Sequence, residues 1–97
     1  MEHIRVATYR LKGGATFQEI ADTAKGGLLD LFRLEPGFRR YEVADFGEGE
    51  LISISLWESR EAAEHGVAAA RGWVAANLAG KIELESNRVA DVAFTAS

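Results

Sequence analysis

The spacing of apolar residues switches repeatedly along this chain, and the order of the switches limits the folds available to it. Residues 2–11 place apolar side chains on alternating sides, a period of two that is typical of a strand. Residues 17–31 instead repeat apolar side chains at intervals of three and four, which predicts an amphipathic helix. The same pair of spacings returns later in the chain, after a second extended segment.

Short signals mark the ends of the first helix. Thr16 and Glu19 form a capping box, in which each side chain is expected to bond the other residue's amide. The helix must end before Pro36, because the proline ring disfavours helical geometry in the residue before it. Gly26 and Gly27 lie inside this segment, so we expect either close packing against the helix or a bend there.

The second half of the chain repeats the pattern after a hairpin. Residues 38–46 and 50–58 alternate and are separated by a glycine-rich turn at 47–49, which predicts two paired strands. Ser59 is a natural N-cap for a helix that reaches about Leu78, with Gly80 at its end. Residues 81–94 form a last extended stretch, with a bulge or bend expected at 86–88.

The resulting order is β-α-β-β-α-β, so residues 1–97 are expected to form one α+β domain of the ferredoxin-like type. Such a domain has a four-stranded antiparallel sheet with two helices on one face. Tyr9, Leu11 or Trp57 is expected on the other face, depending on register. Apolar residues on both faces indicate that the second face is covered too. We therefore predict a homodimer that packs sheet against sheet.

Composition excludes several classes of protein. Eleven Lys and Arg against fifteen Asp and Glu give a net charge of −4, which argues against a nucleic-acid surface. The absence of cysteine removes disulfides, thiolate metal sites and a cysteine nucleophile. No apolar stretch is long enough to span a membrane, and the first residues do not resemble a signal peptide. We expect a soluble protein of a reducing compartment, the cytoplasm.

One set of residues resembles a known family. Pro36-Gly37-Phe38 enters the second strand, and Trp57-Glu58-Ser59 ends the third strand before an alanine-rich helix that carries Trp73. This pattern is similar to that of the antibiotic biosynthesis monooxygenases, which are dimeric α+β barrel proteins. The likeness follows nearly the whole chain in element order, although its distinctive motif covers about twenty residues.

The resemblance implies an activity and a site. Active relatives oxidise polycyclic phenols or hydroquinones with O₂ and use neither a metal nor a flavin, so no cofactor is expected here. In those relatives an Asn four residues before the strand Trp, the Trp itself and a Tyr six residues after it line the pocket. Here Trp57 matches, Ser53 stands at the Asn position and Ala63 at the Tyr position. Ser53 can still donate one hydrogen bond to a substrate oxygen.

Other pocket residues follow from the same resemblance with less direct matches. The arginine expected on the second helix has Arg71 and Asn77 as its nearest polar candidates, and Tyr9 and Trp73 could border the cavity. Tyr41 is a further candidate of this kind, and packing in the core is the favoured role for Trp57, Tyr9, Tyr41 and Trp73. Haem-degrading relatives need an Asn, a Trp and a His at positions that are not matched here, which argues against haem.

Two functions therefore stay open at the level of sequence. The first is a cofactor-independent monooxygenase in which Trp57 shapes the pocket, Ser53 bonds the substrate oxygen, and Arg71 or Asn77 balances negative charge. The second is a non-catalytic module of the same fold that binds a small apolar ligand or only dimerises. His3 and His65 have no third ligand at metal spacing, so no metal site is predicted, and both are expected to be structural or solvated.

Overall fold

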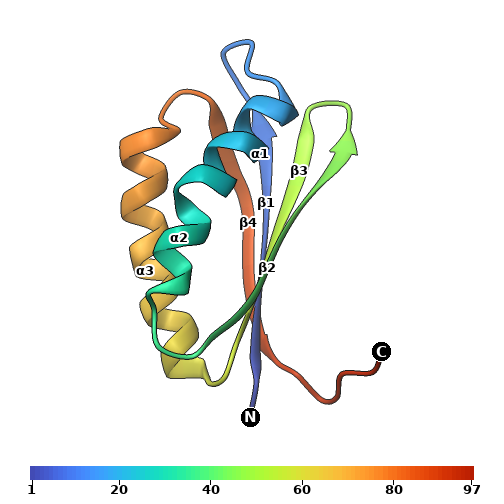
Figure 1. Ribbon diagram of the computed structural model, residues 1–97. Helices are drawn as coiled ribbons and strands as arrows, with labels where there is room; N and C mark the ends of the chain where they lie inside the picture. The colour runs from blue at the N-terminus through green and yellow to red at the C-terminus, as the bar shows by residue number, and fades with distance from the viewer.

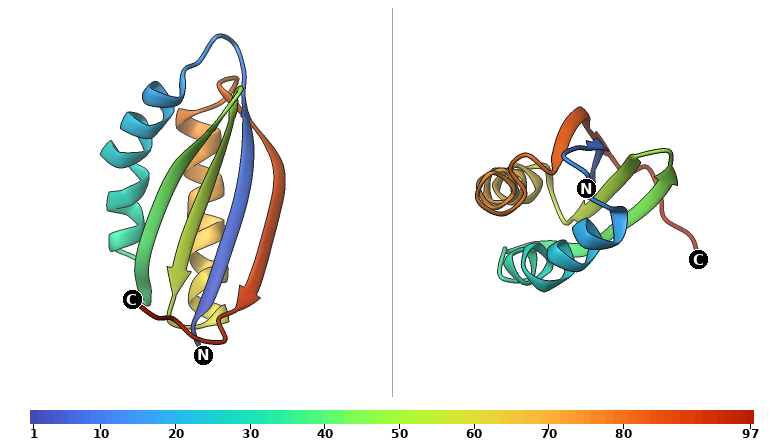
Figure 2. Two further views of the ribbon diagram at one scale, coloured as in Figure 1. Left: turned by 90° about the vertical axis from the view of Figure 1, so that its right-hand side faces the viewer. Right: turned by 90° about the horizontal axis from the view of Figure 1, so that it is seen from above.

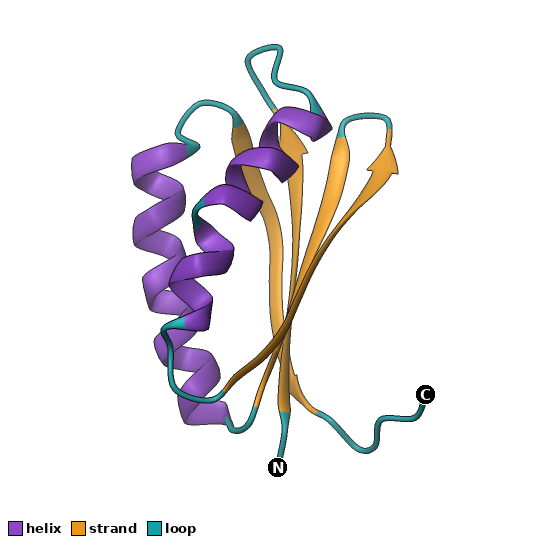
Figure 3. Cartoon of the chain, in the orientation of Figure 1, coloured by secondary structure: helices purple, strands orange, loops and turns teal.

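A four-stranded antiparallel sheet carries all the helices on one face (Figure 1). The computed structural model describes residues 1–97, and the strands are ordered β2-β3-β1-β4 across the sheet. The elements are β1 His3–Leu11, α1 Phe17–Gly26, α2 Leu28–Arg33, β2 Phe38–Gly47, β3 Glu50–Trp57, α3 Arg60–Asn77 and β4 Ile82–Asp91. The predicted ferredoxin-like α+β order is confirmed, with the first helical segment divided in two (Figure 3).

The division of the first helix lies at Gly27. This residue closes α1 and opens α2, with φ −138° and ψ −62°. A Cβ built on Gly27 would lie 2.6 Å from the Trp73 indole on α3, so only glycine fits this approach. Both outcomes expected for the Gly26-Gly27 pair therefore occur at one position: the helix bends, and it does so where another helix packs closely.

The helix caps follow the sequence. Thr16 Oγ1 accepts a hydrogen bond from the Glu19 amide at 3.2 Å, and Ser59 Oγ accepts one from the Ala62 amide at 3.1 Å. The Glu19 carboxylate also accepts a bond from Lys81 Nζ at 2.7 Å, which ties the start of α1 to the start of the last strand. Lys81 and, to a smaller extent, the Thr16 backbone amide lower the pKa of Glu19, as expected for the second bond of a capping box.

Alternate residues of each strand lie on opposite faces of the sheet, and the buried ones face the helices. The prediction that Tyr9, Leu11 or Trp57 lies on the open face is wrong. In β1 the buried residues are His3, Arg5, Ala7 and Tyr9, which face the helices. They pair with Trp57, Ser55, Ser53 and Leu51 of β3, whose side chains are buried on the same face. Tyr9 and Trp57 are therefore under the helices, and Leu11 shares their strand phase.

The open face is nevertheless apolar. The opposite phase of the two central strands carries Ile4, Val6, Ile52, Ile54 and Leu56, and its polar members, Thr8, Arg10 and Glu50, lie toward one end. Seen from above in Figure 2, all helices lie on one side of the sheet and the C-terminal tail extends to the other side. The helix-covered face thus holds the buried polar residues His3, Arg5, Ser53 and Ser55, while the open face leaves a group of apolar side chains uncovered.

The irregularity in the last strand also differs from the prediction. The pairing of β1 with β4 shifts between Thr8 and Tyr9, whose partners are Ser86 and Leu84. Glu85 is therefore the extra residue, one position before the expected segment 86–88. This bulge brings Leu84 and Asn87 onto the helix-facing side of β4, because it reverses the strand phase between them.

Two apolar clusters fill the space between the sheet and the helices. The first packs Phe32 and Trp57 with small residues of α3, and Phe38 and Tyr41 extend it. Phe32 contacts the other three rings at centroid distances of 4.9 to 5.7 Å. The second cluster gathers around Tyr9, Ile20, Leu51 and Leu78.

Candidate functional site in the groove between α3 and β4

A hollow of about 240 Å³ lies between α3 and the edge strand β4. Its lining residues are Arg5, Tyr9, Ala70, Arg71, Val74, Ala75, Leu84 and Asn87. α3 covers the centre of the sheet more fully than its edge, so β4 is exposed from Glu83 to Asp91. The hollow lies at the margin of the part that α3 covers. We call this hollow the α3–β4 groove.

The groove continues inward as a narrow crevice beneath the helices. The crevice shares Arg5, Tyr9, Ala70 and Val74 with the groove and adds a largely apolar wall from α1, α2 and β3. Ser53 and Tyr41 supply its other polar groups. Its free volume is about 20 Å³, enough for about one water molecule.

Arg5 is the most informative residue of the site. It is 7% exposed, on the helix-facing side of β1. Its Nε donates to Asn87 Oδ1 at 3.0 Å, and it forms no ion pair with any carboxylate of the chain. A buried guanidinium without a counterion is unfavourable, because the charge loses water and gains no opposite charge. The site is therefore electrostatically suited to an anion.

Tyr41 supplies a neutral donor near this charge. Burial raises the pKa of Tyr41 to about 12, and the Ser53 hydroxyl and the Arg5 guanidinium lower it only in part. The phenol therefore keeps its proton over the physiological range and can donate it in a hydrogen bond. The crevice thus combines one positive charge with hydroxyl groups and an apolar wall.

The structure brings together three of the six predicted site residues. Tyr9 borders both the groove and the crevice, Ser53 lies in the crevice, and Arg71 stands at the groove. Arg71 forms no ion pair, so its charge is also available to a ligand.

The other three predicted residues lie outside this lining. Trp57 is fully buried, and its Nε1 donates to Ser55 Oγ at 2.9 Å. Trp73 packs against Gly27 and both apolar clusters. Asn77 is exposed, and its side chain donates to the Trp73 carbonyl oxygen at 2.9 Å.

Sequence reasoning missed Arg5 and Asn87 as members of the site. Arg5 carried a usable signal, because it shares the strand phase of Ala7 and Tyr9 and is the charged residue on that side. An arginine on the same strand face as core residues is expected to be buried, and because buried charges are rare, it indicates a functional group. Asn87 had no such signal, since its phase depends on the bulge at Glu85.

Two further features bear on the kind of site. No group of three or more His, Asp and Glu side chains is placed to hold a metal ion. None of the three helices combines the length and the apolar character needed to cross a membrane.

Comparison with known proteins then identifies the family. The sequence profile of the antibiotic biosynthesis monooxygenases matches residues 3–70. The chain belongs to the antibiotic biosynthesis monooxygenase family. The match spans β1 to the middle of α3, so it includes Arg5, Ser53 and Trp57 but not β4. No curated protein sequence matches this chain.

Several solved structures share the fold of this chain. SnoaB from Streptomyces nogalater, described as a cofactor-independent oxygenase, superposes with a TM-score of 0.76 at 16% identity, covering 97% of this chain and 95% of SnoaB. The monooxygenase of the ActVA-Orf6 gene of Streptomyces coelicolor, solved with nanaomycin D, gives 0.65 at 22%, covering 98% and 92%. Rv0793 from Mycobacterium tuberculosis gives 0.62 at 19%, covering 98% and 99%. At these identities the likeness concerns the fold.

Proposed function

We propose that this protein is a cofactor-independent monooxygenase that oxidises an aromatic, quinol-type molecule with O₂ in the α3–β4 groove. The observation that carries the proposal is the buried, unpaired guanidinium of Arg5. A phenol or hydroquinone must ionise before it can give an electron to O₂. A fixed positive charge in a site of low dielectric stabilises that anion strongly.

The other groups of the site support the same chemistry. The neutral Tyr41 phenol and the Ser53 hydroxyl can donate hydrogen bonds to the substrate oxygen. Arg71 lies at the groove and adds a second positive charge. The apolar wall excludes water from the anion. Trp57 stays a predicted site residue that would act by packing β3, because it does not border the groove.

The size of the site sets a condition on binding. A hollow of about 240 Å³ is slightly below the ~300–1,000 Å³ of ordinary ligand sites, and the inner crevice is almost closed. A polycyclic substrate would therefore have to part α3 from β4. The edge strand β4 is the element that would have to yield, since it is exposed from Glu83 to Asp91 and pairs with β1 alone.

The test is oxygen uptake with anthrones and hydroquinones in metal-free buffer. We expect wild-type protein to consume O₂ above the autoxidation blank and Arg5→Gln to reduce kcat/KM by roughly 10²–10³-fold, because it removes the charge on the developing anion. Ser53→Ala and Trp57→Phe test the two residues predicted from the sequence. Arg33→Gln is the matched control, since Arg33 is an exposed arginine of α2.

A second candidate function is a binding or dimerisation module without catalysis. The observation that favours it is the inner crevice of about 20 Å³, which holds no substrate in its present form. Binding of an aromatic ligand in the groove without any O₂ uptake would support this alternative. Uptake that is equal in wild type and Arg5→Gln would remove Arg5 from the mechanism.

We also infer that the protein works as a homodimer that packs through the open face of the sheet. That face presents Ile4, Val6, Ile52 and Ile54 side by side on the two central strands. Arg40 and Glu42 lie on the same face of the edge strand β2 and would form a polar rim. A second copy is the cover whose surface matches this one by symmetry.

A further inference from the structure

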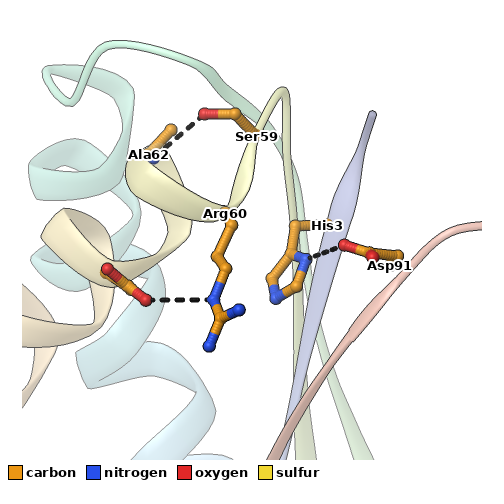
Figure 4. Close-up of polar contacts among 6 residues, drawn as sticks. His3, Ser59, Arg60, Ala62 and Asp91 are labelled. Atoms are coloured by element: carbon orange, nitrogen blue, oxygen red, sulfur yellow. Dashed lines mark hydrogen bonds and ion pairs between the residues drawn. The ribbon is translucent and has the colours of Figure 1, made fainter.

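A histidine and an aspartate form a pair where β1 and β4 begin and end. His3 Nδ1 lies 2.8 Å from Asp91 Oδ1 (Figure 4). A carboxylate only accepts hydrogen bonds, so Nδ1 is the donor, and Nε2 of the neutral ring carries the free lone pair. The carboxylate thus fixes both the tautomer and the orientation of the imidazole.

The free nitrogen of His3 is buried and has no partner. His3 is 5% exposed, and its Nε2 is the one buried side-chain nitrogen or oxygen of the chain without a hydrogen bond. Figure 4 shows this nitrogen on the edge of the ring turned away from Asp91, toward the side of α3. Buried polar atoms are nearly always bonded, so this exception requires an explanation.

The ring of His3 borders a second hollow, also of about 240 Å³, between α3 and β4. Ala63, Val67, Ala68 and Val89 give this hollow an apolar lining. Arg71 lines both this hollow and the α3–β4 groove, so the two hollows adjoin at its side chain. His3 and Arg71 therefore border the same hollow, whose other charged residue is Glu64.

We propose that His3, held by Asp91, is the base that deprotonates the substrate hydroxyl. The O–H bond of a phenol breaks, its electron pair stays on oxygen, and the proton moves to His3 Nε2. The resulting imidazolium lies against the Asp91 carboxylate, and the oxyanion lies near Arg71. This inference rests on the proposed function for the identity of the substrate, but the proton transfer itself requires no oxygen chemistry.

The charges around His3 favour this direction of transfer. From β4 the facing group is Asp91, and from α3 the groups are Arg71, Glu64 and Arg60 (Figure 4). On β1 itself, Arg5 lies two residues along on the same face. The Glu64 carboxylate is occupied by Arg60, whose Nε lies 3.2 Å from its Oε1 (Figure 4). On β3 the residue opposite His3 is Trp57, which has no charge. The imidazolium is thus compensated mainly by Asp91, and the oxyanion by Arg71 together with Arg5 of the adjoining groove.

The first test uses para-nitrophenol, whose phenolate form absorbs visible light, and follows the imidazole nitrogens by NMR. In wild type we expect the bound phenol to ionise at lower pH than the free phenol, while His3 Nε2 becomes protonated. His3→Gln should bind the neutral phenol, and Asp91→Asn should weaken the ionisation with His3 still present. Absence of binding to the wild type, or binding without protonation of His3, overturns the proposal.

The second test uses the oxygen-uptake assay with whichever substrate the wild type accepts. His3→Gln should lower kcat/KM by roughly 10²–10⁴-fold and remove the acidic limb of its pH profile. His65→Gln is the matched control, because His65 is an exposed histidine of α3. Unchanged rates and pH profiles in both His3→Gln and Asp91→Asn overturn the role of the pair and leave the proposed oxygenation standing. A wild type without uptake contradicts the proposed function, while the phenol titration still decides the role of His3.

Discussion

Tyr41 links the chemistry of the site to a measurable property of the whole fold. Its pKa rises from 10.0 to about 12 because the phenol is buried, so the unfolded chain loses this proton first as the pH increases. The contribution to stability is complete below pH 10 and is lost as the pH rises toward 12. We expect the free energy of unfolding of wild type to fall over this interval relative to that of Tyr41→Phe, as measured by urea denaturation.

The absorbance of tyrosinate gives an independent check on the same residue. The chain has two tyrosines, so Tyr41→Phe leaves Tyr9 as the one remaining chromophore of this kind. The difference between the two titrations should show one group that ionises near pH 12. A Tyr41 that titrates near pH 10 in the folded protein would show that its phenol is solvated, and the crevice would then not be a dry site.

Alanine substitutions at two glycines of α3 distinguish the effect of close packing from the effect of helix propensity. A Cβ on Gly66 would overlap the buried Trp57 ring, whereas a Cβ on Gly72 would meet nothing within 4 Å. We expect Gly66→Ala to lower the free energy of unfolding by about 1–3 kcal/mol through overpacking. Gly72→Ala is the control in the same helix and should raise it by about 0.5–1 kcal/mol. Equal effects of the two substitutions would contradict the close packing of Trp57 on α3.

At the scale of elements, the break between α1 and α2 yields a similar pair of variants. Gly27 lies against the Trp73 indole, while the neighbouring Gly26 has open space around its Cα. We expect Gly27→Ala to cost about 1–3 kcal/mol, since the indole must move or the bend must open. Gly26→Ala should be neutral or stabilising by up to about 1 kcal/mol. Thermal unfolding of the two variants side by side measures the difference.

The elements themselves were predictable, because each depends on local spacing and on short capping signals. The capping residues Thr16 and Ser59 and the glycine turn at 47–49 lie where the sequence places them. The face that each strand presents was not predictable in the same way. Both phases of β1 and β3 hold apolar residues, so alternation alone cannot say which phase meets the helices.

The candidate site was the hardest part to predict, because its residues depend on which face each strand turns to the helices. Ser53 and Trp57 share one face, as their even spacing predicts, but they lie far enough along β3 that only Ser53 reaches the crevice. Arg5 and Asn87 belong to strands that are neighbours in the sheet and 82 positions apart in the chain. No local pattern encodes such a contact, and the bulge at Glu85 that sets the phase of Asn87 is itself a property of the paired strands.

At the scale of the whole molecule, the open face of the sheet is the largest feature that a monomer leaves unexplained. Ile4, Val6 and Arg88 also border a shallow depression of about 300 Å³ on this side, beside the edge strand β4. The C-terminal tail, residues 92–97, extends to the same side and carries Phe94 with 83% of its surface exposed (Figures 1 and 2). A second copy packed on this face would cover the isoleucines and give the tail a surface to contact.

Replacement of one residue at the centre of this face tests the dimer. Ile54→Glu places a carboxylate on β3 among Val6, Ile52 and Leu56, and symmetry buries it twice in a sheet-to-sheet dimer. Because an unpaired charge is strongly disfavoured in an apolar interface, we expect the variant to be monomeric by light scattering at concentrations where wild type is dimeric. Ala76→Glu adds the same charge to the exposed side of α3 and should remain dimeric. If Ile54→Glu also remains dimeric, the two copies meet through another surface, and the groove between α3 and β4 becomes the next place to look for their contact.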